Sequence, residues 1–150
     1  VSLHWGDNWG LDIPAEQRQF AHCLIELGAA DLLHGHSSHH PRGIEVYQGH
    51  LILYGCGDLI NDYEGIDAHP PFDPSATCLY FAELDRSSGR LLTLELVPLQ
   101  LRQLRLQRAD AATRGQLHRL LSPACRSLGT DLSTEPASGG HDSWQLHWPA

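Results

Sequence analysis

A cluster of histidines in the first third of the chain has the residue types and the spacing of a metal site. Residues 34–40 read His-Gly-His-Ser-Ser-His-His and directly follow the apolar residues Leu32 and Leu33. Neutral imidazole is the commonest metal ligand in proteins, and the small Gly and Ser residues let several rings converge without crowding. A solvated loop rich in histidine is the alternative. Four histidines in seven positions, at the end of an apolar strand, favour the metal site.

A fifth histidine, His4, follows a short apolar strand that includes Val1 and Leu3. The intervening segment predicts a helix, with Pro14 at its first position, Gly28 at its end and one apolar stripe between them (Phe20, Ala21, Leu24, Ile25 and Leu27). A strand, a helix and a second strand at 30–33 form a βαβ unit, whose two strands run parallel. The loops that follow parallel strands open at the same edge of the sheet. His4 is therefore predicted to lie beside the cluster.

The segment after the cluster predicts a hairpin over residues 44–54, followed by Gly55-Cys56-Gly57-Asp58. The second strand of this hairpin is almost wholly apolar, which indicates that both of its faces are covered. Oxygen-bearing side chains come next, and they are candidates to orient metal-bound imidazoles or to act as acid–base groups: Asp58, Asn61, Asp62 and Glu64. A solvated acidic loop is the alternative for each of them.

The rest of the chain has the pattern of a structural unit. Two strands are predicted at 77–84 and 90–97, and alternating leucines follow with a slip in phase at Arg102-Gln103, which indicates a β-bulge. Asp110 is predicted to cap a helix, and Ser122-Pro123 to open a second short helix.

Composition bounds the possible functions. The chain has 150 residues and a net charge of −8, which argues against a nucleic-acid partner, and no stretch approaches the length of a membrane span. The four scattered cysteines predict reduced thiols, with Cys23 and Cys78 in the core; reduced thiols are typical of the cytoplasm, but the compartment stays open. Because Val1 already reads as part of a strand and the chain contains no Met, we expect a fragment that lacks its N-terminal half.

Five short sequence motifs occur in the same order as in a known protein family, which this chain therefore resembles. They are His4-Trp5-Gly6, Leu27-Gly28-Ala29-Ala30-Asp31, Gly35-His36-Ser37-Ser38-His39-His40, Gly43-Ile44-Glu45-Val46-Tyr47 and Leu53-Tyr54-Gly55-Cys56-Gly57-Asp58. Together they resemble the C-terminal half of the bacterial capsule-synthesis (poly-gamma-glutamate biosynthesis) proteins, a branch of the calcineurin-like metallophosphoesterases. The resemblance covers residues 1–130 and leaves 131–150 as a loose tail, with a possible last strand at 143–147.

The resemblance implies an α/β (α+β) fold, the C-terminal half of a metallophosphatase-like β-sandwich flanked by helices. It also implies a dinuclear site for divalent ions (Mn, Zn, Fe or Mg), with His4, His36 and His39 as ligands and Asp58 as an orienting or catalytic group. The missing half would supply carboxylates. The family tends to read Gly-x-His-Pro-His, and this sequence has Ser37-Ser38 in place of the middle pair, so the last ligand is His39 or His40. Asp58 stands where the family usually has Asn.

Three functions follow from these observations. The first is a metal-dependent phosphoesterase-like protein of capsule synthesis, acting on a phosphoester or an anionic polymer, whose 150-residue part alone binds metal weakly and hydrolyses nothing. The second is a non-catalytic module that binds an anionic polymer or a cell-envelope partner. The third is a structural or storage site for one metal ion.

Overall fold

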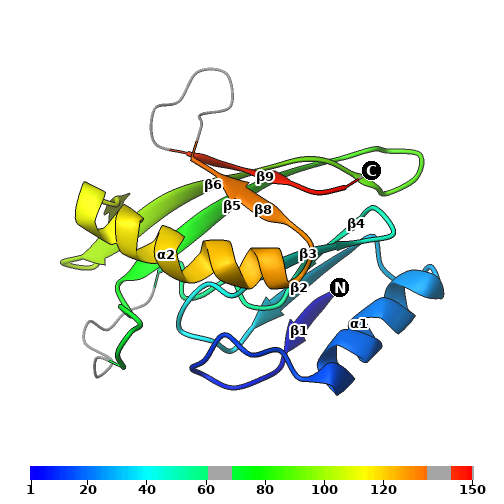
Figure 1. Ribbon diagram of the computed structural model, residues 1–150, viewed down its shortest axis with the longest axis horizontal. Helices are drawn as coiled ribbons and strands as arrows, with labels where there is room; N and C mark the ends of the chain where they lie inside the picture. The colour runs from blue at the N-terminus through cyan, green and yellow to red at the C-terminus, as the bar shows by residue number, and fades with distance from the viewer. Residues whose placement is uncertain (61–68, 135–142, 150) are drawn as a thin grey trace.

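The computed structural model describes residues 1–60, 69–134 and 143–149, which form two helices and nine strands in two sheets (Figure 1). The elements, in chain order, are β1 (Ser2–His4), α1 (Ala15–Glu26), β2 (Leu32–His36), β3 (Ile44–Tyr47), β4 (His50–Leu53), β5 (Ala76–Leu84), β6 (Leu91–Arg102), β7 (Arg105–Arg108), α2 (Ala111–Ser127), β8 (Asp131–Ser133) and β9 (Trp144–His147). The predicted mixed α/β class is confirmed. No helix in the described part of the chain is long and apolar enough to cross a membrane.

The first sheet contains the predicted βαβ unit. Its strand order is β1-β2-β4-β3, and β2 runs parallel to both β1 and β4. Ser2 pairs with His34 and His4 with His36, so the two strands end at the same edge. β3 and β4 form the predicted antiparallel hairpin, with Gln48 and Gly49 in the left-handed conformation that a two-residue turn needs.

The second sheet has the order β5-β6-β9-β8, with β7 paired to β6. The prediction of a β-bulge at Arg102-Gln103 is wrong. Gln103 and Leu104 have φ values of 51° and 58°, and they form a tight turn that sends β7 back along β6. A two-residue turn shifts the phase of an alternating pattern just as a bulge does, so the sequence pattern alone does not separate the two.

One helix replaces the two predicted in the C-terminal part. Asp110 caps α2 as predicted, since its side chain accepts a hydrogen bond from the Thr113 backbone N–H. The helix continues through Pro123, although proline removes one hydrogen bond from a helix interior. The continuous helix keeps Leu117, Leu121 and Cys125 on one face, and all three are buried. Their burial offsets the local cost of the proline.

The segment expected to be a loose tail supplies two strands. β9 is the predicted last strand, and it lies between β6 and β8. Residues 131–133, for which we expected no regular structure, form β8 and pair with β9.

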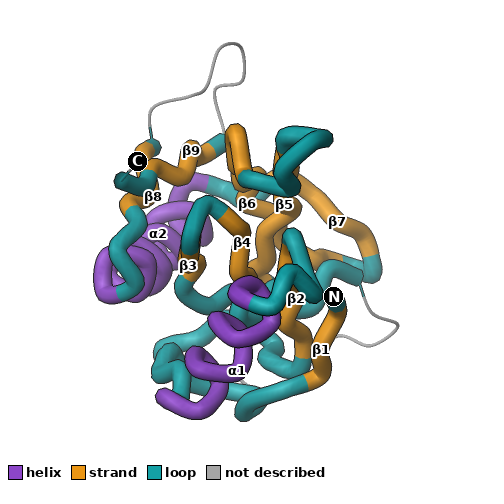
Figure 2. The backbone as a smooth tube through the Cα atoms, turned by 90° about the vertical axis from the view of Figure 1, so that its right-hand side faces the viewer, coloured by secondary structure: helices purple, strands orange, loops and turns teal. Residues whose placement is uncertain are grey.

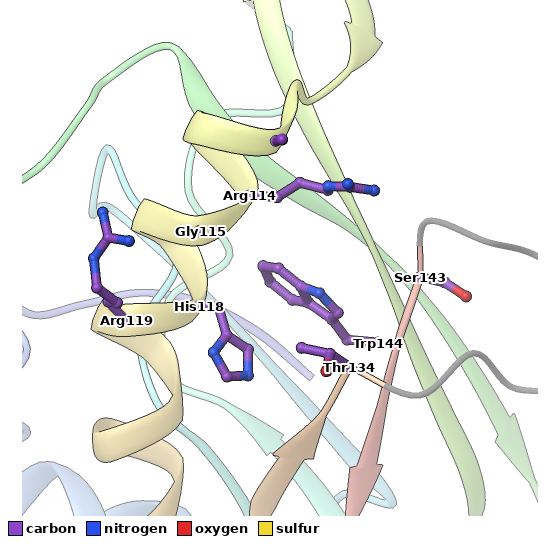
Figure 3. Close-up of a pocket in the computed structure, with 8 residues that line it drawn as sticks. Arg114, Gly115, His118, Arg119, Thr134, Ser143 and Trp144 are labelled. Atoms are coloured by element: carbon purple, nitrogen blue, oxygen red, sulfur yellow. The ribbon is translucent and has the colours of Figure 1, made fainter.

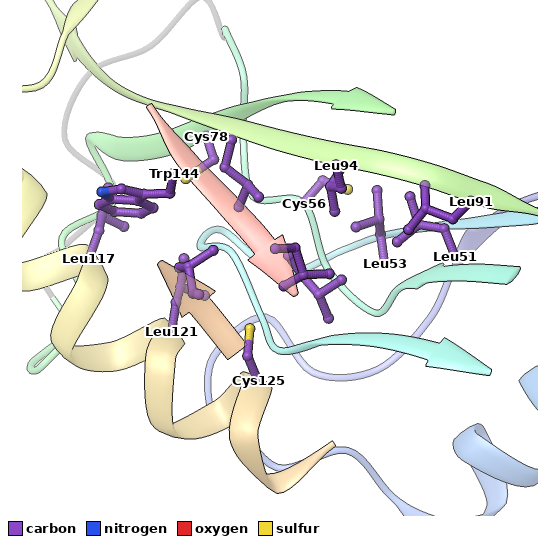
Figure 4. Close-up of a cluster of buried hydrophobic side chains, with 14 of the residues drawn as sticks. Leu51, Leu53, Cys56, Cys78, Leu91, Leu94, Leu117, Leu121, Cys125 and Trp144 are labelled. Atoms are coloured by element: carbon purple, nitrogen blue, oxygen red, sulfur yellow. The ribbon is translucent and has the colours of Figure 1, made fainter. Parts of the chain in front are cut away.

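The two sheets share the main core (Figure 4). Leu51 and Leu53 of β4 pack in one buried cluster with Leu94 and Leu96 of β6, and α2 closes its side. A second buried cluster joins Ala21 and Ile25 of α1 to residues of the first sheet, among them Leu33 and Ile52. The turned view shows α1 beside this sheet (Figure 2). Cys78 is buried as predicted. Cys23 is exposed, so its predicted place in the core is wrong.

A buried carboxylate connects α1 to the first sheet. Glu45 is 5% exposed, and its Oε1 accepts hydrogen bonds from Arg18 Nη2 (2.9 Å) and pairs with His22 Nε2 (3.1 Å). Tyr54 donates its hydroxyl to Oε2 at 2.6 Å. Burial raises the pKa of Glu45, but the hydrogen bonds from Tyr54, His22 and Arg18 outweigh it and lower the pKa overall. The folded state therefore holds this group ionised.

The change Glu45→Gln is expected to lower the free energy of unfolding at pH 7 by about 2 kcal/mol, because a buried hydrogen-bonded charge is lost. The contribution of Glu45 is fully present above the ordinary carboxyl pKa of 4.5 and is lost as the pH falls through the lower pKa of the folded state. Denaturant unfolding between pH 3 and 7 tests this. Glu83→Gln, at an exposed carboxylate on β5, is the control and should leave the pH profile unchanged.

Candidate metal-binding site at the strand ends

The loops that follow β1, β2 and β4 meet at one edge of the first sheet. Trp5 N donates to the carbonyl of His36 (3.0 Å), and His39 N donates to the carbonyl of Asn8 (3.1 Å). Cys56 N, beyond β4, donates to the carbonyl of Gly35 (3.1 Å). These bonds follow from the parallel pairing of the strands, and they place the histidine loop between its two neighbours.

Gly35 lets the three loops close on one another. A Cβ at this position would collide with Trp5 Nε1 and with the backbone oxygens of Leu53 and Tyr54. The space is taken by the hydrogen bond from Trp5 Nε1 to the Tyr54 carbonyl, 3.0 Å long. The residue immediately before His36 must therefore be glycine, because any Cβ there would collide with the neighbouring loops.

His4 and His36 lie side by side, as the βαβ unit predicted. Their ring centroids are 5.4 Å apart in an edge-to-face arrangement, with His4 exposed and His36 half-buried. The Ser2 hydroxyl lies 3.3 Å from His36 Nδ1 and 3.0 Å from His34 Nδ1. Burial lowers the pKa of His34, and the charges of His36 and of the chain's amino terminus lower it further. The result is a row of imidazoles across β1 and β2.

His39 is paired with Asp58. His39 Nδ1 lies 2.8 Å from Asp58 Oδ2, and both side chains are about three-quarters buried. A histidine held by a carboxylate in this way has a fixed ring orientation, and metal-binding histidines commonly donate their other ring N–H to such a carboxylate. The structure thus brings the predicted Asp58 to one predicted ligand, across two loops.

His40 is a core residue of the loop and not an exposed group. It is 3% exposed, its ring stacks on Phe72 at 3.9 Å, and its Nδ1 bonds the Pro41 carbonyl at 2.9 Å. Burial lowers its pKa to about 4, so the ring is uncharged at neutral pH. Between the two alternatives for the last ligand, the more accessible His39 is therefore the better candidate.

Trp9 packs at the centre of this loop region, and the sequence reasoning missed it. Its ring contacts His39, His40, His69 and Phe72, with centroid distances between 5.0 and 6.0 Å. The sequence does contain a signal for this packing, since a tryptophan in a polar loop, five residues after His4, needs a surface to pack against. The Trp9 ring restricts the positions of the His39 and His40 rings.

Arg42 fixes the other side of the same loops. It is 2% exposed and donates hydrogen bonds to the backbone carbonyls of Asp7 and Asp12. Burial lowers its pKa, although the nearby Asp7 and Asp12 carboxylates partly oppose this. A buried guanidinium that bonds backbone oxygens anchors the loop that contains Trp9.

The predicted ligands form two pairs. In the part of the chain that the structure describes, no group of three or more His, Cys, Asp or Glu side chains is arranged to hold a metal ion. His4 lies with His36, and His39 lies with Asp58. The predicted oxygen donors Asn61, Asp62 and Glu64 lie outside the described residues.

Comparison with known proteins relates this chain to a bacterial protein family. Residues 1–63 match the family described as bacterial capsule synthesis protein PGA_cap. This stretch contains β1 to β4 and the strand-end histidines. The resemblance inferred from the motifs is confirmed, and the chain is related to the capsule synthesis proteins.

Individual relatives extend the match. The chain is 45% identical over 136 residues to the probable polyglutamine synthesis accessory proteins of Mycobacterium tuberculosis strains CDC 1551 and H37Rv; the match covers 91% of this chain and 36% of each relative. It is 39% identical over 62 residues to the PGA biosynthesis protein CapA of Bacillus subtilis strain 168, covering 41% of this chain and 16% of that protein. The chain thus spans about a third of the length of its mycobacterial relatives.

The change Gly35→Ala is expected to lower the free energy of unfolding by roughly 3 kcal/mol, because the added methyl group meets backbone oxygens that cannot move aside. Gly115→Ala in α2 is the matched control. There the new Cβ meets only the end of the Arg119 side chain, and alanine favours the helix by about 0.5–1 kcal/mol. Thermal and urea unfolding measure both; equal stability of the two variants would contradict the steric role of Gly35.

Proposed function

We propose that this chain contributes the histidine part of a metal-dependent, phosphoesterase-like site in a protein of poly-gamma-glutamate capsule synthesis. His4, His36 and His39 are the proposed ligands, and Asp58 orients His39. The observation that carries the proposal is the pairing of His39 with Asp58 at the strand end that also holds His4 and His36.

The hydrogen bonds of the rings support this assignment. Nδ1 of His39 faces Asp58, and Nδ1 of His36 faces the Ser2 hydroxyl. When each Nδ1 carries the proton and donates it, the lone pair of Nε2 is available to bind a metal ion. The Ser2 hydroxyl then donates its own proton to His34 Nδ1. Ser2 and Asp58 are thus proposed to set the tautomers of two ligands.

The donor chemistry fits a divalent ion, but three imidazoles do not complete a two-metal site. We therefore propose that carboxylate ligands come from outside the described residues, and that the whole site belongs to a metallophosphatase-like sandwich. When bound at such a site, divalent ions would lower the pKa of a water ligand and would stabilise the charge on a phosphoester. Among the residues described here, Trp9 packs against the His39 ring, and Asp58 keeps this ring oriented.

Asp58→Ala and Ser2→Ala are expected to weaken Mn²⁺ or Zn²⁺ binding by about 10–100-fold, the usual effect of removing a group that orients a metal-binding histidine. His36→Ala should weaken it at least as much. Isothermal titration with each metal measures the affinity. His50→Ala removes an imidazole from the other end of the first sheet, at the start of β4, and should leave the affinity unchanged.

The 150-residue chain alone is expected to bind metal weakly and to give no turnover of bis(4-nitrophenyl) phosphate with added Mn²⁺. The full-length protein should hydrolyse this substrate and lose the activity in the His36→Ala variant. Turnover by the 150-residue chain alone would contradict a site built from two parts of the protein. An equal loss of metal affinity in His50→Ala would contradict the choice of His36 as a ligand.

A further inference from the structure

Helix α1 has apolar side chains on two sides, and the described part of the chain leaves one of them largely exposed. The buried side packs on the first sheet through Ala21 and Ile25. The exposed side consists of residues at the three- and four-residue spacing of one helix face: Phe20, Cys23, Leu24 and Leu27. Phe20 is 51% exposed and Leu27, which ends the helix, is 75% exposed. Cys23 is exposed as well.

Helix α2 has the usual arrangement of a surface helix. Its apolar residues Leu117 and Leu121 are buried, and polar side chains of the same helix, among them Arg114 and His118, line an open pocket beside β9 (Figure 3). Single exposed apolar residues are common on protein surfaces, whereas a continuous apolar stripe marks an interaction surface. The exposed stripe of α1 therefore indicates an interface.

The apolar stripe continues onto the edge of the first sheet. β1 is the edge strand of that sheet, and no described strand pairs with its other side. Val1 is 52% exposed, and Leu3 packs, partly buried, against the same cluster as Leu24. Figure 1 and Figure 2 both show α1 beside β1. An unpaired strand edge next to apolar side chains can accept a further strand together with the side chains that pack over it.

We propose that this apolar face is the interface with the rest of a longer protein to which the chain belongs. The face consists of five side chains: Leu3, Phe20, Cys23, Leu24 and Leu27. The match to the mycobacterial relatives covers 91% of this chain and 36% of each relative, so about two-thirds of each relative lies outside it. A second copy of this chain fits the face less well, because two copies with a net charge of −8 each repel one another.

The inference shares with the proposed function the premise of a longer protein, and it does not depend on the metal site. The rest of the protein would supply a strand that pairs with β1 and apolar side chains that cover α1.

Cys23 is a selective probe of this face, because it is exposed and the other three cysteines are buried. The rate at which a maleimide labels Cys23 is measured by peptide mass spectrometry in the 150-residue chain and in the full-length protein. We expect labelling to be slower by about tenfold or more in the full-length protein, because the covered thiol reacts only after local opening. Equal labelling rates in the two proteins would overturn the proposal.

Leu27→Glu tests the face without changing the probe. In the 150-residue chain it should leave the thermal midpoint unchanged, because Leu27 is 75% exposed there. In the full-length protein it should lower the midpoint and speed the labelling of Cys23, because the new charge is buried in the interface. Leu92→Glu is the matched control, since it adds the same charge at a leucine of β6 that is 51% exposed, and it should leave Cys23 protected. Retained protection of Cys23 in full-length Leu27→Glu would contradict the proposal.

Further outcomes separate this inference from its alternatives. Protection of Cys23 in the 150-residue chain that increases with concentration, together with a dimer in sedimentation, would overturn the proposal in favour of a second copy. A protected Cys23 in a full-length protein that binds no Mn²⁺ would support this inference and refute the metal proposal alone. Equal labelling rates with intact Mn²⁺ binding would refute this inference alone.

Discussion

The parallel pairing of β2 between β1 and β4 is the constraint on which the site depends. It brings the carboxyl ends of three strands to one edge, so that His4, His36 and the loop of His39 meet although 35 residues separate the first from the last. The pairing in turn requires Gly35, since any larger residue would push the loops after β1 and β4 away from β2. Fold and site therefore share one steric condition.

Polar groups within the fold hold this edge in place. Glu45 joins α1 to the first sheet through Arg18, and Arg42 joins the histidine loop to the carbonyls of the loop after β1. Each buried charge is bonded to groups from a different segment, so removing one would leave a partner unsatisfied. The positions of the strand ends thus depend on the buried polar contacts of Glu45 and Arg42 as well as on the apolar core.

The sequence correctly predicted those elements whose residue pattern fits only one kind of secondary structure. The βαβ unit and the hairpin followed from apolar periodicity, and the meeting of His4 and His36 followed from chain geometry. The turn at Gln103-Leu104 did not, because a two-residue turn and a bulge shift the phase of the pattern alike. The helix through Pro123 did not, because burial of its apolar face overrides the local signal of the proline. The burial of His40 and the role of Trp9 depend on side chains from several loops, which spacing along one segment does not reveal.

The central claim is that His4, His36 and His39 act as one set of metal ligands. The most direct measurement is the paramagnetic broadening of imidazole resonances in this chain during titration with Mn²⁺. We expect the signals of these three histidines to broaden first and together, ahead of those of His22, His50 and His118. Unbroadened His39 signals alongside broadened signals of His4 and His36 would contradict it, because His39 would then lie outside the metal site.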